Sequence, residues 1–320
     1  MPDDRVIFKP SECESASLIK GKNTVIMATC QSSMHIFMTS VLSAVINSNP
    51  STVEHFMVCI NGGDDRTEST ALQDRKQAFL EELRRSKWHG RDMPLTVVRV
   101  WSRIGHTQSV EMAIPWVHTE FYTIMHDDVI ITKEDWAESA EAKLSMDRVA
   151  MCKEAPVLQM STNEVKIDGK DFVNLPHINS SFCVCRKSDM TEIGQRWYGY
   201  HFLKDFVIKD TISPERFMEN HAEWAGDDKF VSVEKSYEGL SIDVGGFIWS
   251  AAIDKGYRIE CFDESKSVHL IGMSWCDEKV KNMRLEQHKD SMARIRQKIS
   301  EHPELERIYE KYRRSNAELL

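Results

Sequence analysis

Residues 120–130 read EFYTIMHDDVI, an apolar run interrupted by His126, Asp127 and Asp128. The apolar and aromatic residues before the interruption are typical of a buried β-strand, which we expect over Glu120 to Met125. The three polar side chains then follow at the end of that strand. Imidazole and carboxylate groups placed together can bind a divalent cation, and a mixed nitrogen and oxygen set suits manganese better than calcium. This stretch therefore decides both the expected fold and the expected site.

The chain before this stretch alternates between strand-like and helix-like patterns. Apolar and β-branched runs predict strands at Thr24 to Ala28, His55 to Ile60 and Leu95 to Trp101. Apolar residues at three- and four-residue steps predict helices from Ser33 to Asn47, from Leu72 to Leu83 and from Thr107 to Val117. Pro115 should kink or end the last of these helices. The alternation predicts an α/β protein with a parallel, doubly wound sheet, where ligands bind outside the carboxyl ends of the strands.

The later half of the chain is less regular. Further strands are expected at Ile178 to Arg186 and Tyr257 to Phe262, and further helices at Gly226 to Phe230 and Val244 to Ile253. Thr132 and Asp135 have the spacing of a capping box at a helix start. From Asp277 onward the chain is densely charged and mostly helical. Its apolar repeat is too short to argue a coiled coil, which favours helices packed on the domain, with a dimer through them as the alternative.

Composition excludes several classes of protein. The 320-residue chain has a formal net charge of -9 at pH 7, whereas nucleic-acid binding depends on dense Lys and Arg patches, so no nucleic-acid partner is expected. The eight cysteines form no C-x-x-C pair and several lie in apolar runs, which favours reduced core thiols and the cytoplasm. No run of about 18 uncharged apolar residues is present, so no transmembrane segment is expected. Peripheral attachment to a membrane stays open.

Four stretches, in order, resemble motifs of the family 2 glycosyltransferases, which have the GT-A fold. Residues 24–31, TVIMATCQ, resemble the opening strand, and residues 58–67, VCINGGDDRT, resemble the second strand and its Asp-Gly-Ser-x-Asp-x-Thr turn. Residues 103–105 stand where the family has a loop before its next helix. Residues 120–128 resemble the run into Asp-x-Asp, with His126 in place of the first acid. Ile60 replaces the acid that contacts the nucleobase in the family, so the base is not identified.

The resemblance covers the first 135 residues well and the rest loosely. It implies a GT-A-like, Rossmann-related, mostly parallel central sheet flanked by helices, with a C-terminal helical extension. The division that it implies is an N-terminal extension at 1–22, a nucleotide-sugar-binding half at 23–135, an acceptor-binding half of the same domain at 136–276 and charged C-terminal helices at 277–320.

The resemblance also implies the site residues. A nucleotide-diphosphate sugar of the UDP or GDP type is expected to contact Thr29, Gln31, Asn61, Asp65, Arg103, Gly105 and Asp127. The expected cofactor is Mn²⁺ (or Mg²⁺), held by Asp128 and His126. Residues 267–272, SVHLIG, resemble the family's His-x-x-Gly, which makes His269 the third ligand. Taken alone, Asp127 and Asp128 also fit a solvated turn, and His269 also fits a histidine of the hydrophobic core. The four motifs in the family's order favour the metal site.

Inversion by direct displacement requires a carboxylate that takes the proton of the acceptor hydroxyl. The family supplies this acid a short distance before a Gly-Tyr pair, here Gly256-Tyr257, but the matching position is Gly245. Asp243, close by, is the expected catalytic base, and Asp228 is its rival. For both aspartates, a helix N-cap is the alternative role.

The sequence therefore predicts a metal-dependent, hexosyltransferase-type glycosyltransferase. It would move a sugar from the nucleotide-diphosphate donor to a glycan or other hydroxyl acceptor, with inversion as the expected outcome. Two alternatives keep the fold: a sugar nucleotidyltransferase, and an inactive carbohydrate-binding protein. The former usually carries a Gly-rich, basic loop after the first strand, and residues 29–34 contain neither glycine nor a basic residue. The donor sugar and the acceptor are not identified.

Overall fold

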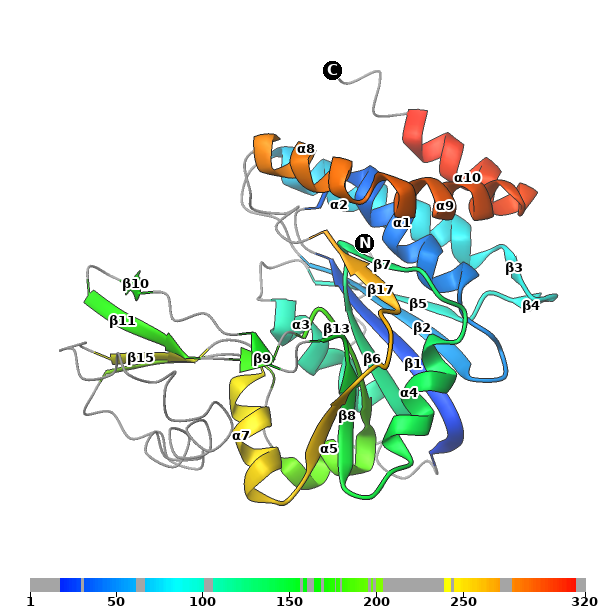
Figure 1. Cartoon of the computed structure of the whole chain (residues 1–320). Helices are drawn as coiled ribbons and strands as arrows, with labels where there is room; N and C mark the ends of the chain where they lie inside the picture. Colours follow the sequence, from blue (N-terminus) through cyan, green and yellow to red (C-terminus); the bar gives the residue numbers. More distant parts are fainter. Residues whose placement is uncertain are drawn as a thin grey trace, which may run out of the picture.

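A seven-stranded sheet forms the centre of the protein in this computed structural model (Figure 1), in the order β16-β8-β13-β6-β1-β2-β5. The structure describes residues 18–29, 32–61, 67–100, 106–155, 158–159, 164–167, 170–175, 177–178, 180–194, 197, 200–203, 239–242, 245–270 and 278–314. The strands of the central sheet are β1 (Ile19–Thr29), β2 (Val53–Ile60), β5 (Leu95–Arg99), β6 (Thr119–His126), β8 (Val149–Lys153), β13 (Phe182–Arg186) and β16 (Arg258–Cys261).

Most of this sheet is parallel. Strand β1 pairs in parallel with β2 and β6, and β2 pairs in parallel with β5. Strand β13 runs antiparallel between β6 and β8, and β16 is parallel to β8. The predicted mostly parallel α/β sheet is confirmed. The carboxyl ends of β1, β2 and β6 lie side by side at one edge, which we call the carboxyl edge.

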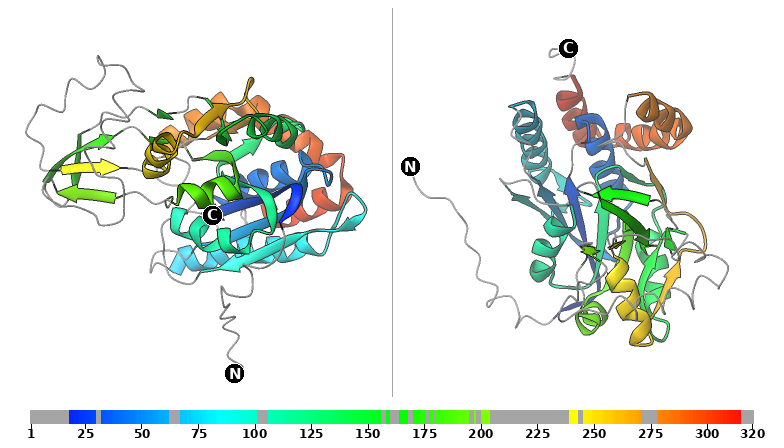
Figure 2. Two further views of the ribbon diagram at one scale, coloured as in Figure 1. Left: turned by 90° about the horizontal axis from the view of Figure 1, so that it is seen from below. Right: turned by 90° about the vertical axis from the view of Figure 1, so that its left-hand side faces the viewer.

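Helices cover both faces of the sheet (Figures 1 and 2). One face carries α1 (Met34–Ile46), α2 (Thr67–Arg84) and α4 (Trp136–Leu144), with α9 (Lys289–Ser300) and α10 (Pro303–Arg314) outside them. The other face carries α3 (His106–Ala113), a 3-10 turn (Ile114–Trp116), α5 (Lys187–Ile193) and α7 (Gly246–Asp254). Strands covered on both faces read as continuous apolar runs, which explains why the sequence marks them so clearly.

The protein has two hydrophobic cores, one on each face of the central sheet, and the side chains of β1 alternate between them. Val25 and Met27 join the core under α1, whereas Ile26 and Ala28 join the core under α3 and α7, because successive strand side chains point to opposite faces. The end of α3 at the Ile114–Trp116 turn confirms the break predicted at Pro115.

The predicted capping box is wrong. Helix α4 does begin just after Asp135, but the Asp135 side chain makes no capping hydrogen bond. Its carboxylate instead lies 2.9 Å from the ammonium of Lys266, and Thr132 Oγ1 donates to the Lys266 carbonyl at 3.1 Å. Lys266 therefore contacts both residues of the predicted capping box, Thr132 through its carbonyl and Asp135 through its ammonium. These two contacts connect Lys266 to the start of α4.

Smaller sheets surround the central one. A four-stranded sheet, in the order β10-β11-β15-β14, projects to one side of the body (Figures 1 and 2). Its strands are β10 (Glu164–Ile167), β11 (Lys170–Leu175), β14 (Tyr200–Leu203) and β15 (Gly239–Ile242). Three two-stranded ladders are β3 (Lys87–Trp88) with β4 (Arg91–Asp92), β7 (Val129–Ile131) with β17 (Ser267–His269), and β9 (Leu158–Gln159) with β12 (His177–Ile178). The domain boundaries set from the sequence stay predictions, and the helix expected at 226–230 lies outside the described residues.

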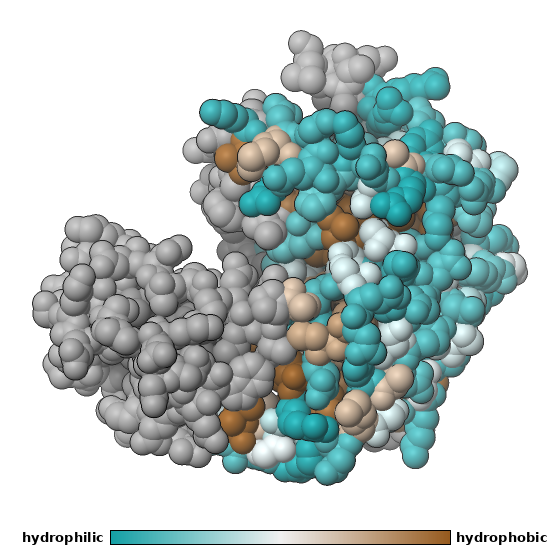
Figure 3. Space-filling view, viewed as in Figure 1, coloured by the Kyte–Doolittle hydropathy of each residue, from teal (hydrophilic) through white to brown (hydrophobic). Residues whose placement is uncertain are grey.

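The C-terminal helices pack on the domain, as the sequence favours. After α8 (Glu278–Gln287), helix α9 contacts α1, and α10 contacts α2. Their inward side chains join the core and are buried: Ile295, Ile299, Leu305, Ile308 and Tyr309. A dimer through these helices stays a prediction. The described part of the face seen in Figure 3 is mostly hydrophilic, with apolar residues in small groups.

Two further expectations concern cysteines and membranes. Cys59, Cys152, Cys183 and Cys185 are free and buried, which confirms core thiols, and burial raises the pKa of Cys59 to about 12. Among the helices that the structure describes, none combines the length and apolar character needed to cross a bilayer.

Candidate metal centre

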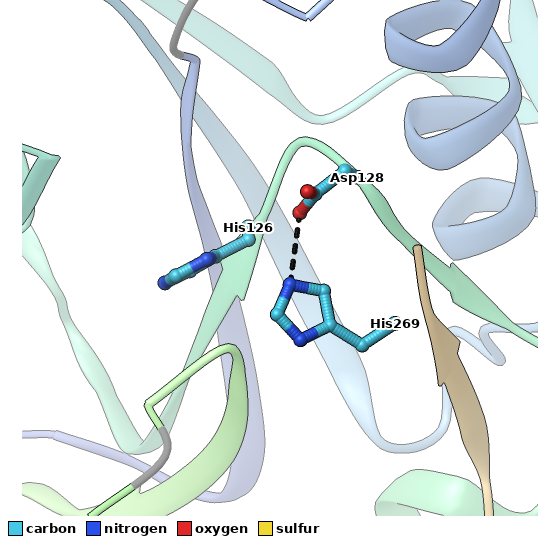
Figure 4. Close-up of side chains that lie close together, drawn as sticks. All are labelled: His126, Asp128 and His269. Atoms are coloured by element: carbon cyan, nitrogen blue, oxygen red, sulfur yellow. Dashed lines mark ion pairs between the residues drawn. The ribbon is translucent and has the colours of Figure 1, made fainter. Parts of the chain in front are cut away.

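Three metal-capable side chains lie close together at the carboxyl edge, and Asp128 and His269 point toward each other (Figure 4). His126 ends β6, Asp128 lies in the turn after it, and His269 ends β17. One ligand atom from each lies within 4.8 Å of the other two, and no other group of three His, Cys, Asp or Glu side chains in the described ranges meets this condition. Asp128 Oδ1 is 3.2 Å from His269 Nε2. The two imidazole rings are nearly perpendicular, at 88°, with their centroids 5.5 Å apart.

Backbone pairing brings His269 to this place. Strand β17 runs antiparallel to the fully buried β7, with His269 opposite Val129, and the Leu270 amide donates to the Asp128 carbonyl at 2.9 Å. Glu154 fixes the start of β17, because its Oε1 accepts from the amides of both Lys266 and Ser267 at 2.7 Å. The predicted third ligand is thus next to the other two, although it comes from far along the chain.

The candidate ligands are partly shielded from water. The side chain of Asp128 is 7% exposed and that of His269 is 20% exposed, so charges here are less screened than on the surface. The Nδ1 atom of His269 is buried and makes no hydrogen bond within the described residues. The contact with Asp128 is therefore what orients this imidazole, with Nε2 toward the carboxylate.

Asp127 is held by the chain itself. Ser32 Oγ donates to Asp127 Oδ2, and Lys76 Nζ lies 3.5 Å from the same oxygen and 3.4 Å from Ser32 Oγ. The side chain of Lys76 is 0% exposed and that of Asp127 is 4% exposed. A charge buried this deeply persists only when it is paired, and these two groups carry opposite charges. The expected contact of Asp127 with the donor stays a prediction.

Thr29 and Asn61, two of the expected donor contacts, lie at the same edge. Thr29 ends β1 and Asn61 follows β2, and both are buried. Thr29 Oγ1 donates to Gln73 Oε1, on α2, at 3.5 Å. The remaining expected site residues lie outside the described residues: Gln31, Asp65, Arg103, Gly105, Asp228 and Asp243.

The sequence reasoning missed the polar residues that α2 contributes. Gln73 and Lys76 are one helical turn apart, and both face the carboxyl edge from α2. A signal was present, because Lys76 stands at helical spacing within the apolar face formed by Leu72, Phe79, Leu80 and Leu83. A lysine in such a stripe is buried only when it is paired, and its partner is an acid distant in sequence.

The donor set fits a divalent cation. Ligand atoms lie about 2.1 Å from such an ion, so two of them are at most about 4.2 Å apart. The 3.2 Å between Asp128 Oδ1 and His269 Nε2 falls within this limit, and the three ligand atoms lie within 4.8 Å of one another. The residues present therefore match what a metal site requires in type, and Asp128 and His269 also match it in position.

Comparison with known proteins finds distant structural likeness. No protein-family model matches the chain, and no curated protein matches it. S. aureus TarS 1-349 is similar, with 11% identity over 84% of this chain and 71% of that chain and a TM-score of 0.40. The mannosyltransferase PcManGT of Pyrobaculum calidifontis, solved with GDP-Man and Mn2+, has 10% identity over 95% of this chain and 77% of that chain and a TM-score of 0.38.

A third similar structure is the inositol-1-phosphate CTP transferase of T. maritima. It has 11% identity over 86% of this chain and 96% of that chain, with a TM-score of 0.38. These likenesses concern the overall fold alone. At such identities and TM-scores they carry no functional assignment, so the function has to be inferred from the residues of the site.

Proposed function

We propose that this protein is a metal-dependent glycosyltransferase that moves a sugar from a nucleotide-diphosphate donor to a glycan or other hydroxyl acceptor, with inversion. The observation that carries the proposal is the convergence of His126, Asp128 and His269 at the carboxyl edge of a mostly parallel sheet. Ligands of such sheets bind at this edge, so the candidate ligands lie where a donor would be held.

The chemistry of the donor explains why these residue types are useful. The leaving group is a nucleoside diphosphate, and its negative charge grows as the glycosidic bond breaks. A bound Mn²⁺ would stabilise that charge more in the transition state than in the ground state. At this edge the buried Lys76 already neutralises Asp127, which leaves the imidazole and carboxylate groups to hold the cation.

The chain's own residues have separate tasks in this proposal. His126, Asp128 and His269 bind the cation, and Thr29 and Asn61 line the donor side of the same edge. The acceptor hydroxyl has to lose its proton as its oxygen attacks the anomeric carbon. We assign that proton transfer to a carboxylate of the acceptor half, Asp243 with Asp228 as its rival.

Donor turnover tests the proposal directly. The full chain is incubated with UDP- and GDP-sugars, with and without Mn²⁺, and release of the nucleoside diphosphate is measured. We expect release that depends on Mn²⁺ and falls at least about 100-fold in Asp128→Ala, because that variant loses the carboxylate ligand. The matched control is Asp263→Ala, since the side chain of Asp263 is 85% exposed and pairs with Lys143 away from the site.

Other outcomes favour the alternatives. Pyrophosphate release from a nucleoside triphosphate and a sugar phosphate would replace the proposal with a sugar nucleotidyltransferase. Thermal stabilisation by a glycan, with no turnover of any donor, would replace it with a carbohydrate-binding protein. Undiminished turnover in Asp128→Ala would remove this site from the mechanism.

A further inference from the structure

A cavity of about 460 Å³ lies between the C-terminal helices and the body of the protein. Its walls are the end of α1, the turn between β3 and β4, the chain after β7 and the junction of α9 with α10 (Figure 1). Small-molecule sites have volumes of about 300–1,000 Å³, so the cavity is large enough for a ligand. It is separate from the carboxyl edge, because α1 begins beside that edge at Met34 and reaches the cavity with Ile46, about 18 Å along the helix axis.

Hydrogen bonds hold several side chains of the lining in place. Trp88 Nε1 donates to the Val45 carbonyl at 3.0 Å. Lys298 Nζ donates to Glu134 Oε1 at 2.6 Å and to Asn47 Oδ1 at 2.7 Å. Side chains that are already fixed have little rotamer freedom left to lose when a ligand binds. The cavity is therefore formed before a ligand arrives.

The turn of the hairpin places a histidine where a smaller residue is usual. His89 and Gly90 connect Trp88 to Arg91, and their φ values are +48° and +81°. Two-residue turns with positive φ at both positions favour Asn, Asp or Gly. His89 lines the cavity, and its Nε2 donates to the Ser48 carbonyl at 3.2 Å, which leaves Nδ1 of the neutral ring as an acceptor. The turn alone gives no reason for an imidazole at this position.

Neither sign of charge dominates the lining. Two lysines, three glutamates and two histidines contribute to it, beside the apolar side chains of Val45, Ile46 and Leu305. A charged ligand would meet groups of its own sign, which costs affinity. A hydroxyl both donates and accepts hydrogen bonds, so it can pair with ammonium, imidazole and carboxylate groups alike. We propose that this cavity binds an uncharged, hydroxyl-rich ligand, namely a sugar or another polyol.

The competing explanation is a gap in packing between the hairpin and the C-terminal helices, filled by water. The Lys87 amide donates to Glu304 Oε2 at 3.2 Å, and this contact by itself joins the hairpin to α10. Under that explanation His89 serves only the turn. Asn fits the same backbone conformation, so it should then replace His89 without any effect on a ligand. The two explanations therefore differ in what His89→Asn does to binding.

The test is isothermal titration calorimetry of the full chain with sugars, without donor and without added metal. The neutral probes are glucose, mannose, N-acetylglucosamine, linear oligosaccharides of each, and myo-inositol. The charged probes are glucuronate and glucosamine. We expect saturable binding of at least one neutral probe, with a Kd at least about three-fold lower than for either charged probe. Tighter binding of an oligosaccharide than of its single unit would identify a glycan chain as the ligand, and equal binding a free sugar or polyol.

Two variants locate the bound sugar. His89→Asn should keep the turn and the thermal midpoint but raise the Kd at least about five-fold, because it removes the imidazole from the lining. Glu301→Ala removes an exposed carboxylate of the lining and should also raise the Kd. The matched control is His118→Asn, the same substitution at an exposed histidine outside the lining, which should leave the Kd unchanged.

Three results would overturn this inference. They are no saturable binding of any neutral probe, tighter binding of a charged probe, and an unchanged Kd in both His89→Asn and Glu301→Ala. Binding that survives in these two variants but is lost in Asp128→Ala would place the sugar at the carboxyl edge. The inference does not depend on the proposed function, which donor turnover tests separately.

Discussion

The carboxyl edge and the C-terminal helical layer both contain many charges, but they hold them differently. At the carboxyl edge the Lys76 and Asp127 pair is almost fully buried, with side-chain exposures of 0% and 4%. In the helical layer, Arg307 pairs with Glu82 of α2 while its own side chain is 59% exposed. Buried charges are costly unless paired, whereas exposed pairs contribute little. Breaking a charge pair should therefore cost much more at the edge than in the layer, where the apolar residues beneath the charges supply the stability.

The largest effect should come from breaking the buried pair. Lys76→Met removes the ammonium beside the buried Asp127 carboxylate, and we expect it to lower the free energy of unfolding by about 3–5 kcal/mol. The double variant Lys76→Met/Asp127→Asn removes both charges and should recover most of that loss. Guanidinium chloride denaturation measures both. Equal losses in the single and double variants would show that the pairing of charges is not what stabilises this edge.

The next effect tests the apolar side of the layer. Ile308 of α10 is 0% exposed within the core, and Ile308→Ala should cost about 2–4 kcal/mol through lost burial and the cavity left behind. Met283 of α8 is 47% exposed, so Met283→Ala should change stability by less than about 0.5 kcal/mol. The two variants are compared by denaturant midpoint. A negligible loss in Ile308→Ala would mean that α10 is not part of the cooperative unit.

A smaller effect should appear as a pH dependence at the junction of α1 and α10. Burial, helped by Arg313, lowers the pKa of His35 from its usual 6.5, and Nδ1 of His35 contacts the Tyr309 hydroxyl at 2.8 Å. The unfolded chain then binds the proton more readily than the folded one, so stability falls as the pH drops below 6.5.

His35→Gln should reduce this loss of stability, as measured by thermal midpoints between pH 7.5 and pH 5.5. The comparison must be made with the wild-type slope, because burial also lowers the pKa values of His55 and His288. If the dependence of the thermal midpoint on pH is unchanged in His35→Gln, the loss of stability at low pH has to be assigned to His55 and His288.

The smallest effect should come from an exposed ion pair of the layer. Arg307 Nη1 is 2.7 Å from Glu82 Oε1, yet Arg307→Ala should lower stability by less than about 1 kcal/mol because solvent screens the pair. The difference from wild type should shrink further in 1 M salt, where charges are screened within about 3 Å. A loss as large as that of Lys76→Met would erase the contrast between the two regions.

Local patterns in the sequence were enough to predict the elements around the site. The strands β1, β2 and β6 and the helix α1 have patterns set by burial on both sheet faces or on one helix face, which a single sequence shows directly. The position of His126 and Asp128 at a strand end follows from the same patterns. His269 was identified through family resemblance, since nothing local indicates that residues 267–269 pair with β7.

The features that were missed depend on partners far apart in the sequence. In the sequence Lys76 is a polar residue within the apolar face of α2, and only the structure shows that Asp127 lies beside it. The capping box failed because Lys266 offers Asp135 a stronger, charged partner than a backbone amide. The reversed direction of β13 was also not predicted, because a buried apolar run looks the same in either orientation.

The pairing of β17 with β7 has a consequence for synthesis on the ribosome. A nascent chain that has just passed residue 131 already contains two of the candidate ligands, but the third is added only when residue 269 leaves the exit tunnel. Domains generally fold as units, so the three candidate ligands should come together only after β17 has emerged. If the centre binds a metal, ribosome-stalled fragments of increasing length should take up the ion abruptly once β17 can pair with β7.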